Sequence, residues 1–306
     1  MEKTEKYRGK RIKEGRVKST GAKVVDFVIA VFISILVILC LVPMINLLAR
    51  SLSSGIAIAQ RQVGLLPVDL TFESYMFVVN DASYVWSLIF TAIITVIAVV
   101  VSMTLTVCMA FPLTYPGLRG KKLFNIMMIM TIYFSAGMIP FFLLMRDLSL
   151  LDNPLVLIIP NSISVFNVII LKSFFMSTIP DSLRESAEIE GANPMQVLFR
   201  IYLPLSLPVL ATLTLFYAVG RWNGFTDALV FIVGNRDFQP IQLRLFQLIQ
   251  GTSSIETATL DPAAVAGVTE SVRAATVMFA TVPILLIYPW LQRFFISGVT
   301  LGAIKE

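Results

Sequence analysis

Several residues and motifs on which enzymes depend are missing from this chain. It contains no histidine, which excludes histidine-based acid–base catalysis and histidine metal ligands. It also lacks the Gly-x4-Gly-Lys-Ser/Thr loop that holds nucleotide phosphates and the Gly-x-Ser-x-Gly turn of serine hydrolases. Its two cysteines, Cys40 and Cys108, lie in apolar runs, which favours packed thiols over a disulfide or a metal site. We therefore expect neither ATP hydrolysis nor any other catalysis on this chain.

Charge is scarce as well, since 57% of the 306 residues are hydrophobic and only 14% are charged. This balance is typical of integral membrane proteins. Six charge-free runs are long enough to cross a hydrocarbon core, and they cover residues 27–49, 84–112, 123–145, 154–171, 205–220 and 274–292. Backbone groups in lipid must be paired within their own segment, and the alternation of a membrane β-barrel is absent. The sequence therefore predicts an all-α integral membrane protein with six transmembrane helices.

Acidic residues are nearly absent from the interior of these runs, and Asp26 lies at an edge. A carrier driven by protons or sodium usually needs such a group near the middle of the membrane. The pattern argues against a secondary carrier or channel, although it leaves that alternative open.

Basic residues are concentrated before the first run, with nine Lys or Arg between Lys3 and Lys23. The positive-inside rule then places both termini in the cytoplasm. We predict a basic cytoplasmic tail at residues 1–23, a transmembrane domain at 24–306 and a long extracellular loop at 221–273. The tail is suited to contact anionic lipid, and no aromatic or fold motif indicates nucleic-acid binding.

A polar segment at residues 180–204 separates the fourth and fifth runs and predicts two short helices. Pro180 suits a helix start, and Gly191 can take the left-handed conformation that ends a helix. Asn193 and Pro194 are a cap and a first-turn residue for the second helix. An apolar stripe follows at helical spacing, formed by Met195, Leu198, Phe199 and Tyr202. The alternative is a generic cytoplasmic loop whose apolar stripe lies on lipid.

The spacing within this segment resembles a known family motif. Glu185, Ser186 and Ala187 are followed by Gly191 after three residues, and then by Ile201, Leu203 and Pro204. This pattern resembles the "EAA" motif of permease subunits in binding-protein-dependent ABC importers, with Ser186 in place of the usual alanine. The resemblance covers roughly residue 65 to the end. Two further stretches, Trp222-Asn223 with residues 239–243 and the C-terminal run 292–305, resemble the carbohydrate-uptake branch and its oligosaccharide permeases.

This resemblance implies a fold, a mechanism and a set of partners. The fold would be that of a type I importer permease in a bacterial cell membrane, carrying a cytoplasmic coupling helix that sits in a cleft on a separate ATPase. ATP and Mg²⁺ would bind that ATPase, so no cofactor is expected here. The implied partners are a homologous second permease, two ATP-binding subunits, an extracellular solute-binding lipoprotein and a sugar. An importer of a non-sugar solute is the alternative.

Residue roles can be carried over to the coupling segment. Glu185 would orient the loop by pairing with a nearby cation, Gly191 would make the turn, and the apolar stripe would anchor the ATPase. The residues assigned to coupling are Glu185, Ala187, Gly191, Met195, Leu198, Phe199, Leu203 and Pro204.

Polar residues inside the membrane runs suggest a path for the solute. Asn161, Ser164 and Asn167 recur every three residues, so a helix would place them on roughly one face. Interhelical packing is the alternative role for these three. Tyr217, Trp222 and Asn223 are suited to sugar contacts, while interfacial anchoring is the alternative for the two aromatic residues.

Overall fold

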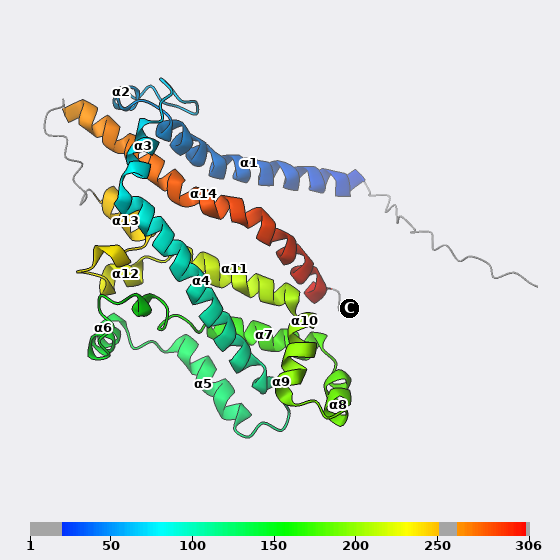
Figure 1. The fold of residues 1–306 in the computed structure, drawn as a ribbon. Helices are drawn as coiled ribbons and strands as arrows, with labels where there is room; N and C mark the ends of the chain where they lie inside the picture. The colour runs from blue at the N-terminus through cyan, green and yellow to red at the C-terminus, as the bar shows by residue number, and fades with distance from the viewer. Residues whose placement is uncertain (1–19, 251–261, 304–306) are drawn as a thin grey trace, which may run out of the picture.

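A computed structural model describes residues 20–250 and 262–303 of the chain, and the ordered elements within these ranges are helical (Figure 1). The first half comprises α1 (Thr20–Ser51), α2 (Gly55–Ala59), α3 (Glu73–Asn80), α4 (Ala82–Ala110), η1 (Pro112–Thr114), α5 (Lys121–Tyr133), α6 (Met138–Asp147) and η2 (Pro154–Leu157). The second half comprises α7 (Val165–Thr178), α8 (Asp181–Ile189), α9 (Pro194–Val197), η3 (Leu198–Tyr202), α10 (Leu203–Leu205), α11 (Leu207–Asn223), α12 (Thr226–Phe231), η4 (Arg236–Phe238), α13 (Ile241–Ile249) and α14 (Pro262–Ala303). The predicted all-α membrane class is confirmed.

Three helical segments are long and apolar enough to cross a membrane alone, namely Val24–Ser51, Ala82–Thr114 and Ala266–Ile287. Two further pairs could each make one broken span, since α5 and α6 meet at 113° and the segment Pro194–Leu205 meets α11 at 83°. Length and composition thus give three to five spans among the described residues. The predicted count of six stays a prediction.

Two of the predicted spans are not continuous helices. In the third, Phe134 is extended and Gly137 has a φ of +84°, a conformation that glycine tolerates, so the chain turns sharply between α5 and α6. In the fourth, Asn153 caps a short 3₁₀ turn, and the α-helix starts only at Val165. Pro160 accounts for part of this difference, because the residue before a proline is biased away from helical backbone.

The predicted extracellular loop at 221–273 is largely helical where the structure describes it. It contains α12, η4, α13 and the first turns of α14, while residues 251–261 lie outside the described part. Helix α13 packs into the protein through four buried apolar side chains, namely Ile241, Leu243, Leu245 and Leu248.

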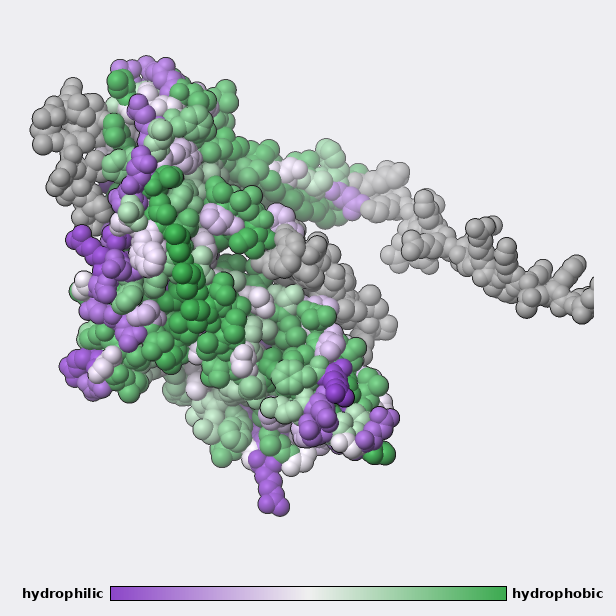
Figure 2. All heavy atoms as spheres, viewed as in Figure 1, coloured by the Kyte–Doolittle hydropathy of each residue, from purple (hydrophilic) through white to green (hydrophobic). Residues whose placement is uncertain are grey.

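Helix α11 packs against both α4 and α14 at the centre of the bundle (Figure 1). Helix α1 contacts α14 near its own C-terminal end, where Ala49 and Ser51 are buried, and most of its other apolar side chains are exposed. Figure 2 shows hydrophobic residues spread over α4 and the neighbouring helices, with hydrophilic residues gathered over α8 at one end and around α12 and α13 at the other. A belt of exposed apolar side chains between two polar ends is typical of a protein surrounded by lipid.

Candidate functional site

The segment between α7 and α11 forms the predicted helix–turn–helix. Helix α8 begins after Pro180, whose backbone is extended, and it ends at Glu190. Gly191 follows with a φ of +85°, as its left-handed role requires. The next helix, α9, starts with a capping box, because Asn193 Oδ1 accepts from the Gln196 amide and Gln196 Oε1 accepts from the Asn193 amide, each at 2.9 Å. Sequence analysis identified Asn193 as a cap but missed Gln196.

The chain leaves this helix–turn–helix through a π-helical turn, η3, and the short helix α10. Leu203 is partly buried against the core and Pro204 is exposed. The 83° bend into α11 occurs at Ser206, shortly after Leu203 and Pro204. Pro204 and Pro208 flank this point, and neither has the amide hydrogen that a continuous helix would need.

The apolar stripe of this segment is divided between two faces. Met195 and Phe199 are one helical turn apart and are 62% and 63% exposed. Leu198 and Tyr202 are likewise one turn apart but are buried, so Leu198 belongs to the core and does not face a partner as sequence analysis assumed. The hydrophobic spacing could not distinguish the exposed pair from the buried pair, because the two residues of each pair are four positions apart.

Helix α8 has one buried and one exposed face. Its inward face carries Ala187 and Arg184, and Arg184 is only 5% exposed. Leu183 is exposed, as is Ile189 at 87%. The outward apolar residues of the helix–turn–helix are therefore Leu183, Ile189, Met195 and Phe199.

Three carboxylates surround the guanidinium of Arg184 on α8. Asp181 lies at 3.1 Å, Glu185 at 3.7 Å and Glu188 at 3.8 Å. The cation near Glu185 is thus a residue of the same helix. The guanidinium also lies over the ring of Tyr115, 5.1 Å from its centroid. Burial, and then the charge of Glu188, raise the pKa of the Tyr115 phenol above its ordinary value.

A pocket of about 530 Å³ opens between α4, α7, α11 and α12. Asn161, Ser164, Asn167 and Tyr217, four residues predicted for the solute path, all line it. Asn161, Ser164 and Asn167 were predicted to share one face of a helix. Instead, Asn161 precedes α7 and Ser164 is its N-cap, so only Asn167 lies within the helix. The pocket also contains Ser102, Thr226, Phe166 and Phe216, so its wall combines amides and hydroxyls with aromatic rings.

Tyr217 holds the wall of this pocket in place. Its hydroxyl shares a hydrogen bond with Thr106 at 2.7 Å and accepts from the Ser164 amide at 3.2 Å, which ties α11 to α4 and to the start of α7.

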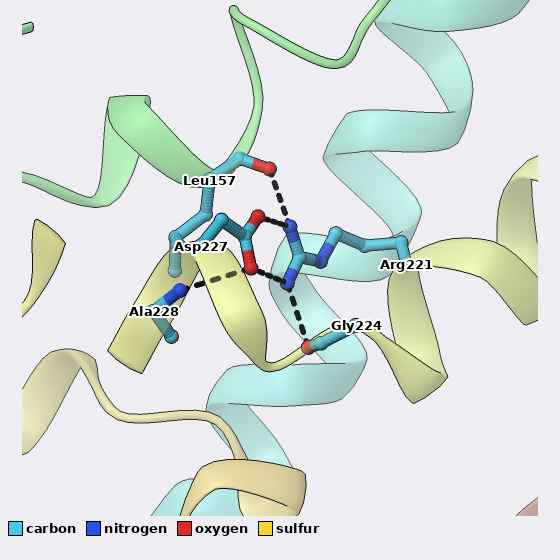
Figure 3. A network of polar contacts seen from close by, with 5 residues as sticks. All are labelled: Leu157, Arg221, Gly224, Asp227 and Ala228. Atoms are coloured by element: carbon cyan, nitrogen blue, oxygen red, sulfur yellow. Dashed lines mark hydrogen bonds and ion pairs between the residues drawn. The ribbon is translucent and has the colours of Figure 1, made fainter. Parts of the chain in front are cut away.

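A buried ion pair closes one side of the same pocket (Figure 3). Arg221 lies one turn after Tyr217, and both its Nη atoms bond the carboxylate of Asp227. The guanidinium also donates to the carbonyls of Leu157 and Gly224, each at 2.9 Å. Sequence analysis missed this pair, although two opposite charges six residues apart between apolar runs were an available signal.

Trp222 and Asn223 do not line this pocket, which corrects the prediction that grouped them with Tyr217. Successive residues of a helix are about 100° apart, so Trp222 points away from the face shared by Tyr217 and Arg221. Its indole lies in an apolar groove against α14 and donates to the carbonyl of Ala280 at 3.4 Å. Asn223 is exposed.

Comparisons with known proteins agree with this arrangement. Residues 105–301 match the family model described as the binding-protein-dependent transport system inner membrane component. The chain is 35% identical to the polygalacturonan/rhamnogalacturonan transport system permease protein YtcP of Bacillus subtilis, over 92% of this chain and 98% of that protein. It is 34% identical to the protein LplC of the same organism, over 87% and 89%.

A solved structure is similar as well. It belongs to a bacterial ABC transporter involved in the import of the acidic polysaccharide alginate, and the matched chain superposes with a TM-score of 0.81 at 35% identity. The match covers 91% of this chain and 99% of that one. Members of the family are membrane components of importers and not enzymes, and they work with a second permease, an ATPase and a solute-binding protein. The chain belongs to the family of binding-protein-dependent transport system inner membrane components and is a permease subunit of an ABC importer.

Proposed function

We propose that this permease imports an oligosaccharide or polysaccharide and that the pocket between α4, α7, α11 and α12 is its half of the path. The relative YtcP and the structural neighbour, each at 35% identity, support this, since YtcP is named for polygalacturonan/rhamnogalacturonan transport and the neighbour for alginate import. The lining supports it too, because amides and hydroxyls bond sugar hydroxyls while Phe166, Phe216 and Tyr217 can pack on sugar rings. Trp222 and Asn223 are not part of this proposal.

The helix–turn–helix α8–α9 would dock in a cleft of the ATPase, which would bind ATP and Mg²⁺. Its outward apolar residues provide the contact, with Met195 and Phe199 at its centre. The left-handed Gly191 and the capping box fix the angle between the two helices, so the segment is rigid enough to transmit a movement. Glu185, mostly exposed beside Arg184, contributes a negative charge to the same surface. This capped, partly apolar surface at the end of a lipid-facing bundle is the observation that carries the proposal.

The orientation would place both termini in the cytoplasm. The N-terminal end of α1 and the last turns of α14 point toward the side of the molecule that carries α8 and α9 (Figure 1). If the ATPase binds α8 and α9, these ends are cytoplasmic too, as the basic tail at residues 1–23 favours. The opposite end, with α2, α12 and α13, would meet an extracellular solute-binding lipoprotein. The complete assembly would contain a homologous second permease and two ATP-binding subunits.

Docking can be tested with the four-subunit complex purified from a membrane extract. Gly191→Pro cannot adopt a φ of +85°, and Glu185→Lys reverses a charge on the proposed surface. We expect both variants to insert in the membrane with their partner permease but to lose the co-purifying ATPase and uptake. Normal uptake by both variants would refute the docking role.

The path can be tested separately with Asn167→Leu. Asn167 is 5% exposed in this chain and lines the pocket, so its loss should lower uptake about twofold to tenfold at unchanged ATPase docking. Asn223→Leu is the matched control, because Asn223 is exposed outside the pocket. Unchanged uptake by Asn167→Leu would indicate a packing role. Uptake of labelled oligosaccharides and of a non-sugar solute by the wild-type complex decides the solute class.

A further inference from the structure

Arg184 is buried without the hydrogen bonds that usually accompany a buried charge. Its Nη1 atom has no hydrogen-bond partner among the described residues. Two of its three ion pairs are longer than 3.5 Å, and all three carboxylates are at least 41% exposed. Ion pairs of this kind are weakened by water and contribute little to stability. Another interaction must therefore explain why the side chain points inward.

The stacking of Arg184 on Tyr115 supplies that interaction. A guanidinium is planar and weakly hydrated, and it is attracted to the face of an aromatic ring. Tyr115 lies in the loop after η1, so the contact joins α8 to a segment that follows α4 directly. The other inward residue of α8, Ala187, has only a methyl group to contribute.

Tyr115 is the outer member of a continuous series of aromatic contacts. Its ring meets the ring of Phe111 edge to face at 5.4 Å, Phe111 meets Tyr202 at 5.1 Å, and Tyr202 meets Phe175 at 5.2 Å. All three contacts are close to perpendicular, an arrangement that aromatic rings prefer. Phe111, Tyr202 and Phe175 are each at most 5% exposed.

The series connects α8 to the elements that line the pocket. Phe111 caps α4, whose Ala98 and Ser102 lie in the pocket wall, and Phe175 belongs to α7, which contributes Asn167. Tyr202 is the last residue of the π-helical turn η3. Packed side chains in close contact cannot deform independently, so displacement of one ring must displace the next.

We propose that Arg184 is a positioning residue that fixes α8 to the membrane bundle, and that the series Tyr115–Phe111–Tyr202–Phe175 carries a movement of α8 to α4 and α7. The proposal rests on the docking of α8 and α9 to the ATPase argued above. It separates two tasks within one helix. Leu183, Ile189, Met195 and Phe199 would bind the ATPase, while Arg184, on the opposite face, would pass the movement on without touching it.

The test uses the complete complex in liposomes with its solute-binding protein. Two quantities are measured, namely the amount of ATPase that co-purifies and the stimulation of ATP hydrolysis by loaded binding protein. Arg184→Met removes the cation at similar length, Tyr115→Leu removes the ring, and Tyr115→Phe keeps it. Arg119→Met is the control, since Arg119 is an exposed arginine in the loop that carries Tyr115.

Arg184→Met and Tyr115→Leu should each reduce the stimulation about threefold to tenfold while ATPase co-purification stays within twofold of wild type. The double variant should be no worse than either single variant, because both remove the same contact. Tyr115→Phe and Arg119→Met should behave as wild type. Thermal melting of each complex in detergent shows whether a variant is folded. Arg184→Lys keeps the charge and weakens the stacking, so its stimulation should lie between those of wild type and Arg184→Met.

The role of this contact would be overturned if the double variant lost stimulation by the product of the two single-variant factors. Normal stimulation in Arg184→Met would overturn it too. Loss of ATPase co-purification in Arg184→Met would also overturn it, because Arg184 would then belong to the docking surface. Failure of the wild-type chain to bind any ATPase would instead overturn the proposed function. The two failures are therefore distinguishable.

Discussion

Two arginines in this protein are almost equally buried but are held in opposite ways. Arg221, beside the membrane pocket, donates to both oxygens of Asp227 and to two backbone carbonyls (Figure 3). Arg184, at the end proposed to dock the ATPase, has three partly exposed carboxylates at 3.1–3.8 Å and an aromatic ring. The first guanidinium is fixed by direction-dependent hydrogen bonds from three elements. The second is held by contacts that weaken gradually with distance and depend little on angle.

This difference corresponds to the position of each residue in the transport cycle proposed here. A buried network of several hydrogen bonds to one guanidinium is costly to disturb, so Arg221 and Asp227 keep α11, α12 and the segment around Leu157 together as one unit, although Nε of Arg221 has no partner among the described residues. A guanidinium on a ring can slide by a fraction of an ångström and lose little energy. Arg184 thus suits a junction between parts that move relative to each other, and Arg221 suits a wall that must keep its shape.

The largest expected effect comes from removing the partner of Arg221. Asp227→Leu leaves a buried charge without its counter-ion, which should destabilise the permease by about 3–5 kcal/mol. The measurement is thermal melting of the purified permease pair in detergent, together with its amount in the membrane.

The exposed pair Arg146–Asp147 provides the control for this variant. Asp147→Leu removes a carboxylate of the same type from a solvated ion pair, where such contacts are worth about 1 kcal/mol or less. Equal melting temperatures for Asp227→Leu and Asp147→Leu would show that Arg221 is not held rigidly by its ion pair.

Local signals in the sequence were sufficient to predict the helix–turn–helix. Pro180, Gly191, Asn193 and Pro194 each determine the backbone around themselves, and the structure places all four as their chemistry requires. The same holds for Asn153 at η2. Hydrophobicity alone was a weaker guide, because residues 123–145 and 154–171 are apolar throughout and yet contain a sharp turn and a 3₁₀ segment. Apolar length indicates residence in a membrane and does not by itself indicate a straight helix.

The direction in which side chains point was beyond sequence reasoning. Arg184 is buried whereas its neighbour Leu183 is exposed, and the ring on which Arg184 lies belongs to Tyr115, sixty-nine residues earlier. Similarly, Asn161 and Tyr217 line one pocket because of contacts between α4, α7 and α11 that no local pattern contains. Tertiary contacts of this kind decide the site, whereas turns and caps decide only the elements that carry it.

A smaller effect is expected at the turn between α8 and α9. Gly191→Ala meets no atom within 4 Å, so its only cost is the left-handed backbone, about 1–2 kcal/mol. The turn should then open more often, and hydrogen exchange of α8 amides should accelerate about fivefold to thirtyfold. Gly117→Ala is a suitable control, since it also lies in open space and lacks a positive φ. Equal exchange rates in the two variants would mean that Gly191 is not needed for the turn.

The smallest effect should come from the cap of α9. Asn193→Ala removes the acceptor for the Gln196 amide but keeps the Asn193 amide that donates to Gln196 Oε1, and loss of such a cap typically costs about 1 kcal/mol, while Asn193→Ser keeps an acceptor and should cost less. Because α9 carries Met195 of the outward face while Arg184 is on the inward side, this variant should weaken ATPase binding without changing the stimulation measured per bound ATPase. Reduced stimulation at full ATPase binding would place the cap of α9 in the same mechanical connection as Arg184, and the distinction between the docking face and the transmitting face of this segment would no longer hold.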